Sequence, residues 1–262
     1  MSKPPVIDTH AHLTDESFAT SMPQLIDAAK QAGLVRIGVI GFDAVTSQAA
    51  CRLAARYPDM LFASVGIQPH SALAASPDDW ASIERLAQDA HVHALGETGL
   101  DLYWDDTPLA VQQDYFERHI DLSESTQMPL VIHLRDSGPQ IIDQLRPHSA
   151  AGIVRGVMHS FTGDLDTCRA CLNMGLYISF AGMVTFKNSD ELRLIAAYVP
   201  ADRLLVETDC PYLSPEPFRG KRPNVPARVV HSLEVIAKAR GVSYVDLAIQ
   251  TTANAKRLFG LE

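Results

Sequence analysis

The strongest constraint on the fold is a regular alternation of short apolar segments with longer amphipathic ones along all 262 residues. The apolar segments have the length and composition of strands, and the segments between them have the spacing of helices. The predicted strands are Val6–His12, Arg36–Gly41, Leu61–Ile67, His93–Glu97, Leu130–His133, Val154–His159, Tyr177–Phe180 and Leu204–Glu207. The predicted helices are Met22–Ala32, Val45–Tyr57, Asp78–Gln88, Pro108–Thr126, Gly138–Leu145, Leu165–Met174, Glu191–Tyr198, Val225–Arg240 and Tyr244–Leu258.

Eight strands, each followed by a helix, predict an α/β protein with a parallel sheet closed into a single (β/α)₈ TIM-like barrel. The length suits one such domain over residues 1–262, and no linker or shorter repeat interrupts the pattern. An open doubly wound sheet is the alternative. That fold usually has fewer strands, and the chain lacks a G-x-G-x-x-G turn after its first strand.

Composition limits the partners and the compartment. The net charge of −9 argues against binding of polyanions by the whole surface, so any nucleic-acid contact must use local basic patches or bound metal. No membrane-spanning run or signal-peptide pattern is found, so we expect a cytoplasmic protein without membrane contact, and a monomer. Cys51, Cys168, Cys171 and Cys210 are expected to be structural thiols rather than disulfides or a zinc knuckle.

Two histidines end the first predicted strand. His10 and His12 are spaced i, i+2, and this spacing places both imidazoles on one face of a strand. Two adjacent imidazoles can bind one zinc-like divalent ion, although two structural histidines would have the same spacing. The rest of the chain must decide between these interpretations.

A barrel would bring further polar residues to the same place, because its active site lies at the carboxyl ends of the strands. The polar and ionisable residues at those ends are His10, His12, Gln68, His70, Glu97, His133, His159 and Asp209. Buried ionisable groups are costly unless they are paired or bind metal. This set therefore favours a metal centre over structural histidines.

The number of donors suggests two ions. His10, His12, Glu97 and Asp209 can form one site, and Glu97, His133 and His159 a second, with Glu97 as the bridge. Two ions about 3.5–4 Å apart suit phosphate-ester hydrolysis. In that scheme Asp209 is the candidate acceptor of the proton from the attacking water.

Two further carboxylates are expected behind the donor residues. Asp8 lies two residues before His10, and Glu207 lies two residues before Asp209. Carboxylates in such positions can orient metal-bound imidazoles and fix their tautomers. The other interpretation of each is a solvated or ion-paired carboxylate.

Basic residues follow several of the strands. Arg135, Lys187 and the stretch Phe218–Arg222, which contains Arg219 and Lys221, fall on loops at the rim that holds the histidines. Positive side chains beside two metal ions favour a phosphate-bearing substrate. An ordinary solvated loop at 219–222 is the alternative.

Together these residues resemble the TatD family of metal-dependent hydrolases, in the amidohydrolase superfamily. The likeness runs nearly end to end. Its motifs are Asp8–His12, Gly96–Asp101, Pro129–His133, His159–Gly163, Ser179–Asn188, Glu207–Leu213, Arg219–Lys221 and Thr251-Thr252 with Asn254 and Leu258-Phe259.

The resemblance implies a TIM-like barrel, divalent metal and deoxyribonuclease activity, often as a 3′-to-5′ exonuclease on single strands. It also implies that His10, His12, Glu97, His133, His159 and Asp209 are the metal ligands, with Asp209 and Glu97 as the catalytic carboxylates. Gln68 and His70 fall in a substrate-binding motif where the family usually has histidine in place of Gln68, and Asn224 lies in a partial match. Glutamine can hydrogen-bond a phosphate but cannot act as an acid or base near neutral pH.

Imidazole donors favour zinc or nickel as the bound metal, whereas the resemblance implies activity with magnesium or manganese. We therefore expect two divalent ions and DNA, single-stranded in particular, as the partner. A metal-dependent amide or ester hydrolase such as an aminoacyl-tRNA deacylase is the second candidate. A non-catalytic nucleic-acid-binding scaffold is the third, and the full donor set argues against it.

Overall fold

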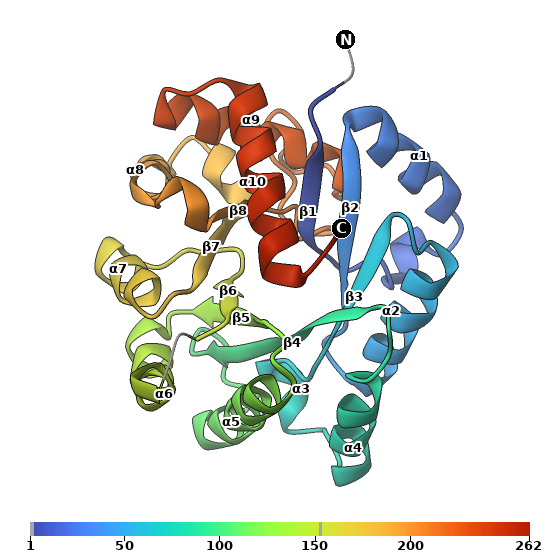
Figure 1. The fold of residues 1–262 in the computed structure, drawn as a ribbon, viewed down its shortest axis with the longest axis vertical. Helices are drawn as coiled ribbons and strands as arrows, with labels where there is room; N and C mark the ends of the chain where they lie inside the picture. The colour runs from blue at the N-terminus through green and yellow to red at the C-terminus, as the bar shows by residue number, and fades with distance from the viewer. Residues whose placement is uncertain (1–2, 152–153) are drawn as a thin grey trace.

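The computed structural model of the chain describes residues 3–151 and 154–262. Eight parallel strands form one sheet in the order β1-β2-β3-β4-β5-β6-β7-β8, and helices surround it (Figure 1). The strands are β1 (Val6–Ala11), β2 (Leu34–Ile40), β3 (Leu61–Val65), β4 (Val92–Asp101), β5 (Leu130–Arg135), β6 (Gly156–Met158), β7 (Tyr177–Phe180) and β8 (Leu204–Val206). The helices are α1 (Met22–Ala32), α2 (Ala44–Arg56), α3 (Pro69–Ala72), α4 (Pro77–Leu86), α5 (Leu109–Thr126), α6 (Gly138–Ala151), α7 (Leu165–Asn173), α8 (Asp190–Tyr198), α9 (Val229–Arg240) and α10 (Tyr244–Phe259).

The sheet closes through the backbone at the carboxyl ends of β8 and β1. Asp209 donates its N–H to the His10 carbonyl at 3.0 Å, and His12 donates to the Cys210 carbonyl at 2.7 Å. An isolated parallel bridge joins Ala11 to Cys210 at the same place. The barrel predicted from the sequence is therefore confirmed.

Local sequence explains where several helices begin and end. Asp43 and Ser76 accept hydrogen bonds from the third residue of α2 and α4, and both helices have a complete capping box. Gly33, Gly241 and Gly260 end α1, α9 and α10 in the left-handed conformation that glycine adopts most readily.

The core has two parts. A large cluster fills the space between the strands and the surrounding helices, and it includes the buried thiols of Cys168 and Cys171 on α7. A smaller cluster lies inside the barrel, where Ile7, Phe62 and Leu205 meet Phe259 at the end of α10. All four cysteines are buried free thiols, as predicted.

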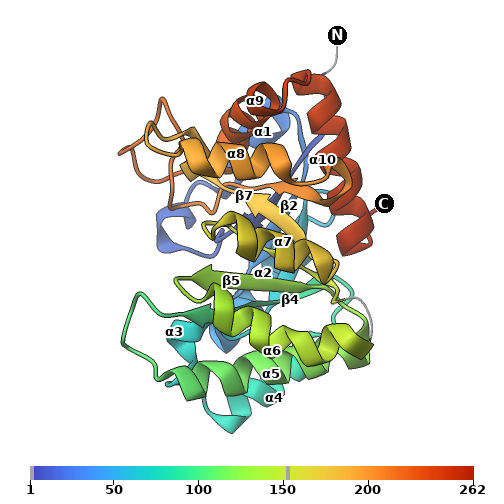
Figure 2. The same cartoon turned by 90° about the vertical axis from the view of Figure 1, so that its left-hand side faces the viewer.

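Figure 2 shows the barrel from the side, with α10 at one end and the loops after β4 and β8 projecting at the other. The arrows of β5 and β7 point toward these loops, so the loops lie at the carboxyl ends of the strands. The amino end of the barrel is closed by apolar packing against α10, which leaves the opposite rim for polar groups.

Several predicted boundaries were wrong. β4 continues past Glu97 to Asp101, α6 continues past Leu145, and α9 begins at Val229, after a 3₁₀ turn at Pro226–Arg228. The short helix α3 was not predicted. Among the described residues no helix is both long and apolar enough to cross a membrane.

Buried polar bonds attach α10 to the first and last strands. Asn254, which is fully buried, donates from Nδ2 to the carbonyls of Ala201 at 2.7 Å and Leu204 at 2.9 Å. Thr252 donates from Oγ1 to the Pro5 carbonyl at 2.8 Å. These contacts account for the polar Thr252 and Asn254 on the buried face of α10.

We expect Asn254→Ala to lower the free energy of unfolding by roughly 2–4 kcal/mol, because it leaves two buried carbonyls without their donor. Urea denaturation followed by circular dichroism measures the change. Gln250→Ala on the same helix is the matched control and should lose less than about 1 kcal/mol, because its side chain bonds only to Asn254 Oδ1 among the residues that the structure describes. Equal losses in the two variants would contradict the anchoring role of Asn254.

Candidate metal centre

The predicted donor residues converge at the carboxyl ends of five strands. His10 and His12 come from the end of β1, Glu97 from within β4, and His133 from β5. The residues after β6 and β8 add His159 and Asp209. His10, His12, Glu97 and His159 are all buried, with at most 6% of their surface exposed.

Four donor atoms form a first group around one point. His10 Nε2 lies 3.2 Å from His12 Nε2, 3.7 Å from Glu97 Oε2 and 3.6 Å from Asp209 Oδ1. His12 Nε2 lies 3.6 Å and 3.4 Å from the same two oxygens. Metal bonds of about 2.0–2.2 Å at tetrahedral angles separate ligand atoms by about 3.3–3.6 Å, so this spacing fits a divalent ion.

A second group lies against the other oxygen of Glu97. Oε1 is 2.9 Å from His133 Nδ1 and 3.2 Å from His159 Nε2, and these two nitrogens are 3.4 Å apart. Each oxygen of a single carboxylate therefore points into a different set of nitrogens. A carboxylate placed in this way has one oxygen available to each donor group.

The state of Glu97 supports a cation at the centre. Its Oε2 atom is buried and has no hydrogen-bond partner among the described residues, although such an atom is costly to bury alone. Burial by itself would raise the pKa of the Glu97 carboxyl, but His159 and His133 hold it well below its usual range. An ionised carboxylate with one unpaired oxygen, surrounded by imidazole nitrogens, is suited to hold a metal ion.

Asp101, at the end of β4, supports the second group from behind. Its Oδ2 atom accepts hydrogen bonds from His133 Nε2 at 2.8 Å and from His70 Nε2 at 3.1 Å. A proton on His133 Nε2 leaves Nδ1 free to face Glu97 and coordinate metal. Burial raises the pKa of Asp101, yet its bonds with His133 and Trp104 lower the value to about 2.

The role of Asp101 was missed from the sequence, where it appeared only as the end of a family motif. A signal was present, because Asp101 follows Glu97 by four residues and thus shares its face of a regular strand. It was overlooked because the predicted strand stopped at Glu97.

The two carboxylates predicted behind the histidines differ in their surroundings. Glu207 Oε1 lies 3.4 Å from His159 Nδ1 and accepts the N–H of Ser160 at 2.7 Å. Asp8 instead accepts hydrogen bonds from the N–H and Oγ1 of Thr208, at 2.9 and 2.6 Å.

Asp8 thus makes no described contact with the His10 ring, whose Nδ1 atom has no hydrogen-bond partner in the part of the chain that the structure describes. The pairing of β1 with β2 has a register irregularity between Asp8 and Ala11. Burial raises the pKa of Asp8 to about 8, and the residue links β1 to β8.

The residues predicted to bind substrate fall into three classes: exposed cations, the pair Gln68 and His70 at the start of α3, and the buried Asn224. Lys187, Arg219 and Lys221 are exposed, with Arg219 stacked 4.2 Å from the Phe186 ring centroid. Arg135 is also exposed and stacks 4.4 Å from the ring centroid of Tyr103.

His70 lies nearer the donor groups, bonded to the Asp101 carboxylate behind His133. His70 Nδ1 is 3.1 Å from Asp106, so this ring lies between two carboxylates. Gln68 precedes α3 and is partly buried.

Asn224 does not suit a substrate-binding role. Its side chain is fully buried, donates to the Thr208 carbonyl at 3.1 Å and accepts from the N–H of Val225. The side chain is used within the loop after β8, so the substrate contact predicted for it has no support in the structure.

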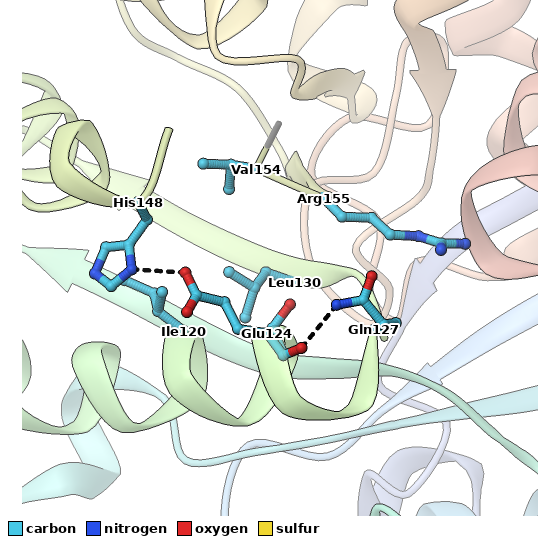
Figure 3. Close-up of a pocket in the computed structure, with 8 residues that line it drawn as sticks. Ile120, Glu124, Gln127, Leu130, His148, Val154 and Arg155 are labelled. Atoms are coloured by element: carbon cyan, nitrogen blue, oxygen red, sulfur yellow. Dashed lines mark hydrogen bonds and ion pairs between the residues drawn. The ribbon is translucent and has the colours of Figure 1, made fainter. Parts of the chain in front are cut away.

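A separate hollow lies on the outside of the barrel, near the amino ends of β5 and β6. It is lined by residues of α5 and α6 and by Leu130 and Arg155, which lie at the start of β5 and just before β6 (Figure 3). Figure 3 shows His148 bonded to Glu124 in this hollow, and none of the metal donors lines it. The hollow is therefore distinct from the candidate metal centre.

Comparison with known proteins agrees with this geometry. Residues 7–260 match the family described as TatD related DNase. The chain belongs to the TatD family. An uncharacterized metal-dependent hydrolase of Bacillus subtilis, YabD, is 40% identical over 97% of this chain and 98% of its own length.

Two other relatives extend the comparison within the TatD family. A protein of Erwinia billingiae named 3′-5′ ssDNA/RNA exonuclease TatD is 35% identical over 98% of this chain and 99% of its own. The crystal structure of the TatD homolog YjjV of Escherichia coli K12 superposes with a TM-score of 0.92 at 27% identity, covering 98% of each chain. This TatD-family protein is a metal-dependent hydrolase with a TIM-barrel fold, as the sequence predicted.

We expect Asp101→Asn to weaken metal binding about 10- to 100-fold, because asparagine has one acceptor oxygen where Asp101 uses two, one for the histidine rings and one for backbone N–H groups. Titration of the metal-free protein with Zn²⁺ or Mn²⁺ in a calorimeter measures the affinity. Asp105→Asn, an exposed neighbour, is the matched control and should bind like the parent. Parent-like affinity in Asp101→Asn would contradict the positioning role.

Proposed function

We propose that this TatD-family protein hydrolyses phosphodiester bonds of nucleic acid, removing nucleotides from the 3′ end of single-stranded DNA with water activated at two divalent ions. The observation that carries the proposal is the Glu97 carboxylate, whose two oxygens face two separate sets of nitrogens at 2.9–3.2 Å and 3.6–3.7 Å. The name of the Erwinia billingiae relative supports single-stranded nucleic acid as the substrate.

The donor groups define the proposed division of labour. His10, His12, Asp209 and Glu97 would hold one ion, and Glu97, His133 and His159 the other. Bound there, such ions lower the pKa of water towards neutrality and stabilise the charge that develops on phosphate oxygens. The mixed donor set suits zinc or nickel in affinity and manganese or magnesium in activity.

Asp209 is the proposed proton acceptor. Its side chain is 14% exposed, against 5% for Glu97, so Asp209 is the more accessible carboxylate of the donor set. A water molecule entering from the rim would therefore meet Asp209 before Glu97. Glu97 and Asp209 are thus given different roles, the first in holding metal and the second in moving a proton.

Positive charge at the rim supports a phosphate-bearing substrate. Lys187, Arg219 and Lys221 are exposed on the loops after β7 and β8, in a chain of net charge −9. In our proposal these side chains position phosphates and take no part in proton transfer. Gln68, where the family usually has histidine, would contribute a hydrogen bond only.

We expect the catalytic carboxylate and the loop cations to differ in kinetic effect. Asp209→Asn should lower kcat by about 10²- to 10⁴-fold, because it removes a ligand and the proton acceptor. Arg219→Ala and Lys221→Ala should mainly raise KM and reduce the salt slope by about 1 each. An exonuclease assay on end-labelled single-stranded DNA over a salt series measures these constants.

Arg146→Ala, an exposed cation on α6, is the control and should leave KM and the salt slope unchanged. Loop variants that behave like the parent would remove the loop from substrate binding. Release of the amino acid from an aminoacyl-tRNA, without cleavage of DNA, would replace the nuclease by a deacylase.

Metal analysis tests the number of ions. The parent, loaded with excess metal and then desalted, should retain nearly two equivalents, and His133→Ala or His159→Ala should retain about one. His231→Ala, on α9 and beside Glu234, is the matched control and should retain the parent value. Unchanged stoichiometry in both His133 and His159 variants would contradict the assignment.

We also expect the second group to lose its metal first on acidification. Burial lowers the pKa of His133 and His159, but their carboxylate partners outweigh it, so both values lie above the ordinary one. Of the two histidines in the first group, His12 has a raised pKa, whereas the pKa of His10 lies well below the ordinary value. A histidine must lose its proton to bind metal, so the higher pKa values make protons compete at higher pH.

Stoichiometry measured from pH 8 down to about pH 5 should therefore fall from two equivalents to one before it falls to zero. In His133→Ala the first of these steps should be absent. Loss of both equivalents in a single step, or a first step that survives in His133→Ala, would contradict the order.

A further inference from the structure

The loop after β4 exposes two large aromatic side chains next to each other. Tyr103 and Trp104 are 55% and 56% exposed, and their ring centroids are 4.9 Å apart at an interplanar angle of 85°. Exposed aromatic residues of this size are unfavourable in water when they stand together, so such a pair marks a binding surface.

The pair is attached to the candidate metal centre by a single carboxylate. Asp101 Oδ1 accepts the backbone N–H groups of Tyr103 at 2.9 Å and Trp104 at 3.1 Å. The other oxygen of Asp101 accepts from His133 Nε2, and His133 Nδ1 is 2.9 Å from Glu97. The aromatic loop and the donor nitrogen of His133 are therefore held by the same side chain.

A cation lies against one face of the pair. The Arg135 guanidinium is 4.4 Å from the Tyr103 ring centroid, and Leu102 donates its N–H to the Arg135 carbonyl at 2.9 Å. This stacking restrains Tyr103 and brings a positive charge to the aromatic surface. Aromatic rings combined with a nearby arginine are the usual means of binding the bases and phosphates of single strands.

We propose that Tyr103 and Trp104 form a stacking platform for an unpaired nucleobase of the substrate, with Arg135 holding Tyr103 and facing the adjoining phosphate. The inference rests on the proposed function and names the feature by which the substrate is selected. Bases inside a duplex have both faces covered, and a terminal base is still held in its pair, so an unpaired base turns onto the platform more readily. The platform therefore favours single-stranded over double-stranded ends.

The position of the platform favours a nucleobase over a protein partner. Two of its backbone N–H groups and one histidine of the candidate metal centre share Asp101, so the loop that carries the platform is anchored at the donor groups. A bound strand can place a base on the rings and a phosphate at the donor groups at the same time.

Fluorescence binding tests the proposal without any cleavage. The chain has two tryptophans, so Trp80→Phe leaves Trp104 as the sole tryptophan reporter. The metal-free Trp80→Phe protein is titrated with a short oligothymidylate and with an abasic oligonucleotide of equal length and charge. We expect oligothymidylate to quench Trp104 and to bind roughly 5- to 150-fold more tightly than the abasic strand.

Variants separate the platform from the rest of the surface. In anisotropy measurements with labelled strands, Trp104→Ala and Tyr103→Ala should each reduce the preference for bases, and Tyr103→Phe should retain it. Tyr198→Ala is the matched control, since Tyr198 is 49% exposed and stacks with Arg169 at 5.3 Å but lies at the end of α8.

Equal affinity for the two oligonucleotides, or a base preference that survives in Trp104→Ala, would overturn the platform even if the protein cleaves DNA. Base-dependent binding without hydrolysis under any divalent metal would support the platform and overturn the phosphodiesterase proposal. The two failures are thus distinguishable.

Discussion

The site depends on the backbone contact that closes the barrel. Because Asp209 donates to the His10 carbonyl and His12 donates to the Cys210 carbonyl, the ends of the first and last strands are fixed side by side. His10 and Asp209 are 199 positions apart in the chain, yet their side chains come within 3.6 Å. Asp209 has a positive φ of 53°, a conformation that aspartate tolerates better than most residues.

Electrostatics then limits what this closed rim can contain. Glu97 is surrounded by four histidines in a buried site, and the apolar layer sealed by Phe259 lies inside the barrel towards its amino end. Such a collection of ionisable groups is costly without a cation, because each group loses its hydration. The apolar packing that stabilises the barrel therefore lies at the amino ends of the strands, and the ionisable groups lie at the carboxyl ends.

The donor groups also depend on supports that are not themselves donors. Asp101 holds His133 and the backbone of the aromatic loop, and Glu207 lies behind His159. Asp8, in contrast, secures the junction of β1 and β8 through Thr208. Similar carboxylates thus support a candidate metal ligand in one place and barrel closure in another, and only their neighbours distinguish the two roles.

The sequence by itself determined the barrel, because eight apolar segments alternating with amphipathic helices have few other ways to bury their surfaces. It also indicated which residues meet at the rim, since His10 and Asp209 occur where a strand ends or leads into its loop, and Glu97 lies in the second half of β4. Only the tertiary structure decided how each oxygen of Glu97 is used and where Asp101 and Asn224 point. β4 extends to Asp101 because Gly99, with no side chain, lets it lie against the backbone of β5, where an added Cβ would be 2.3 Å from the His133 carbonyl oxygen. Such contacts join segments distant in the chain, so the physical forces that select them act only once the strands are side by side.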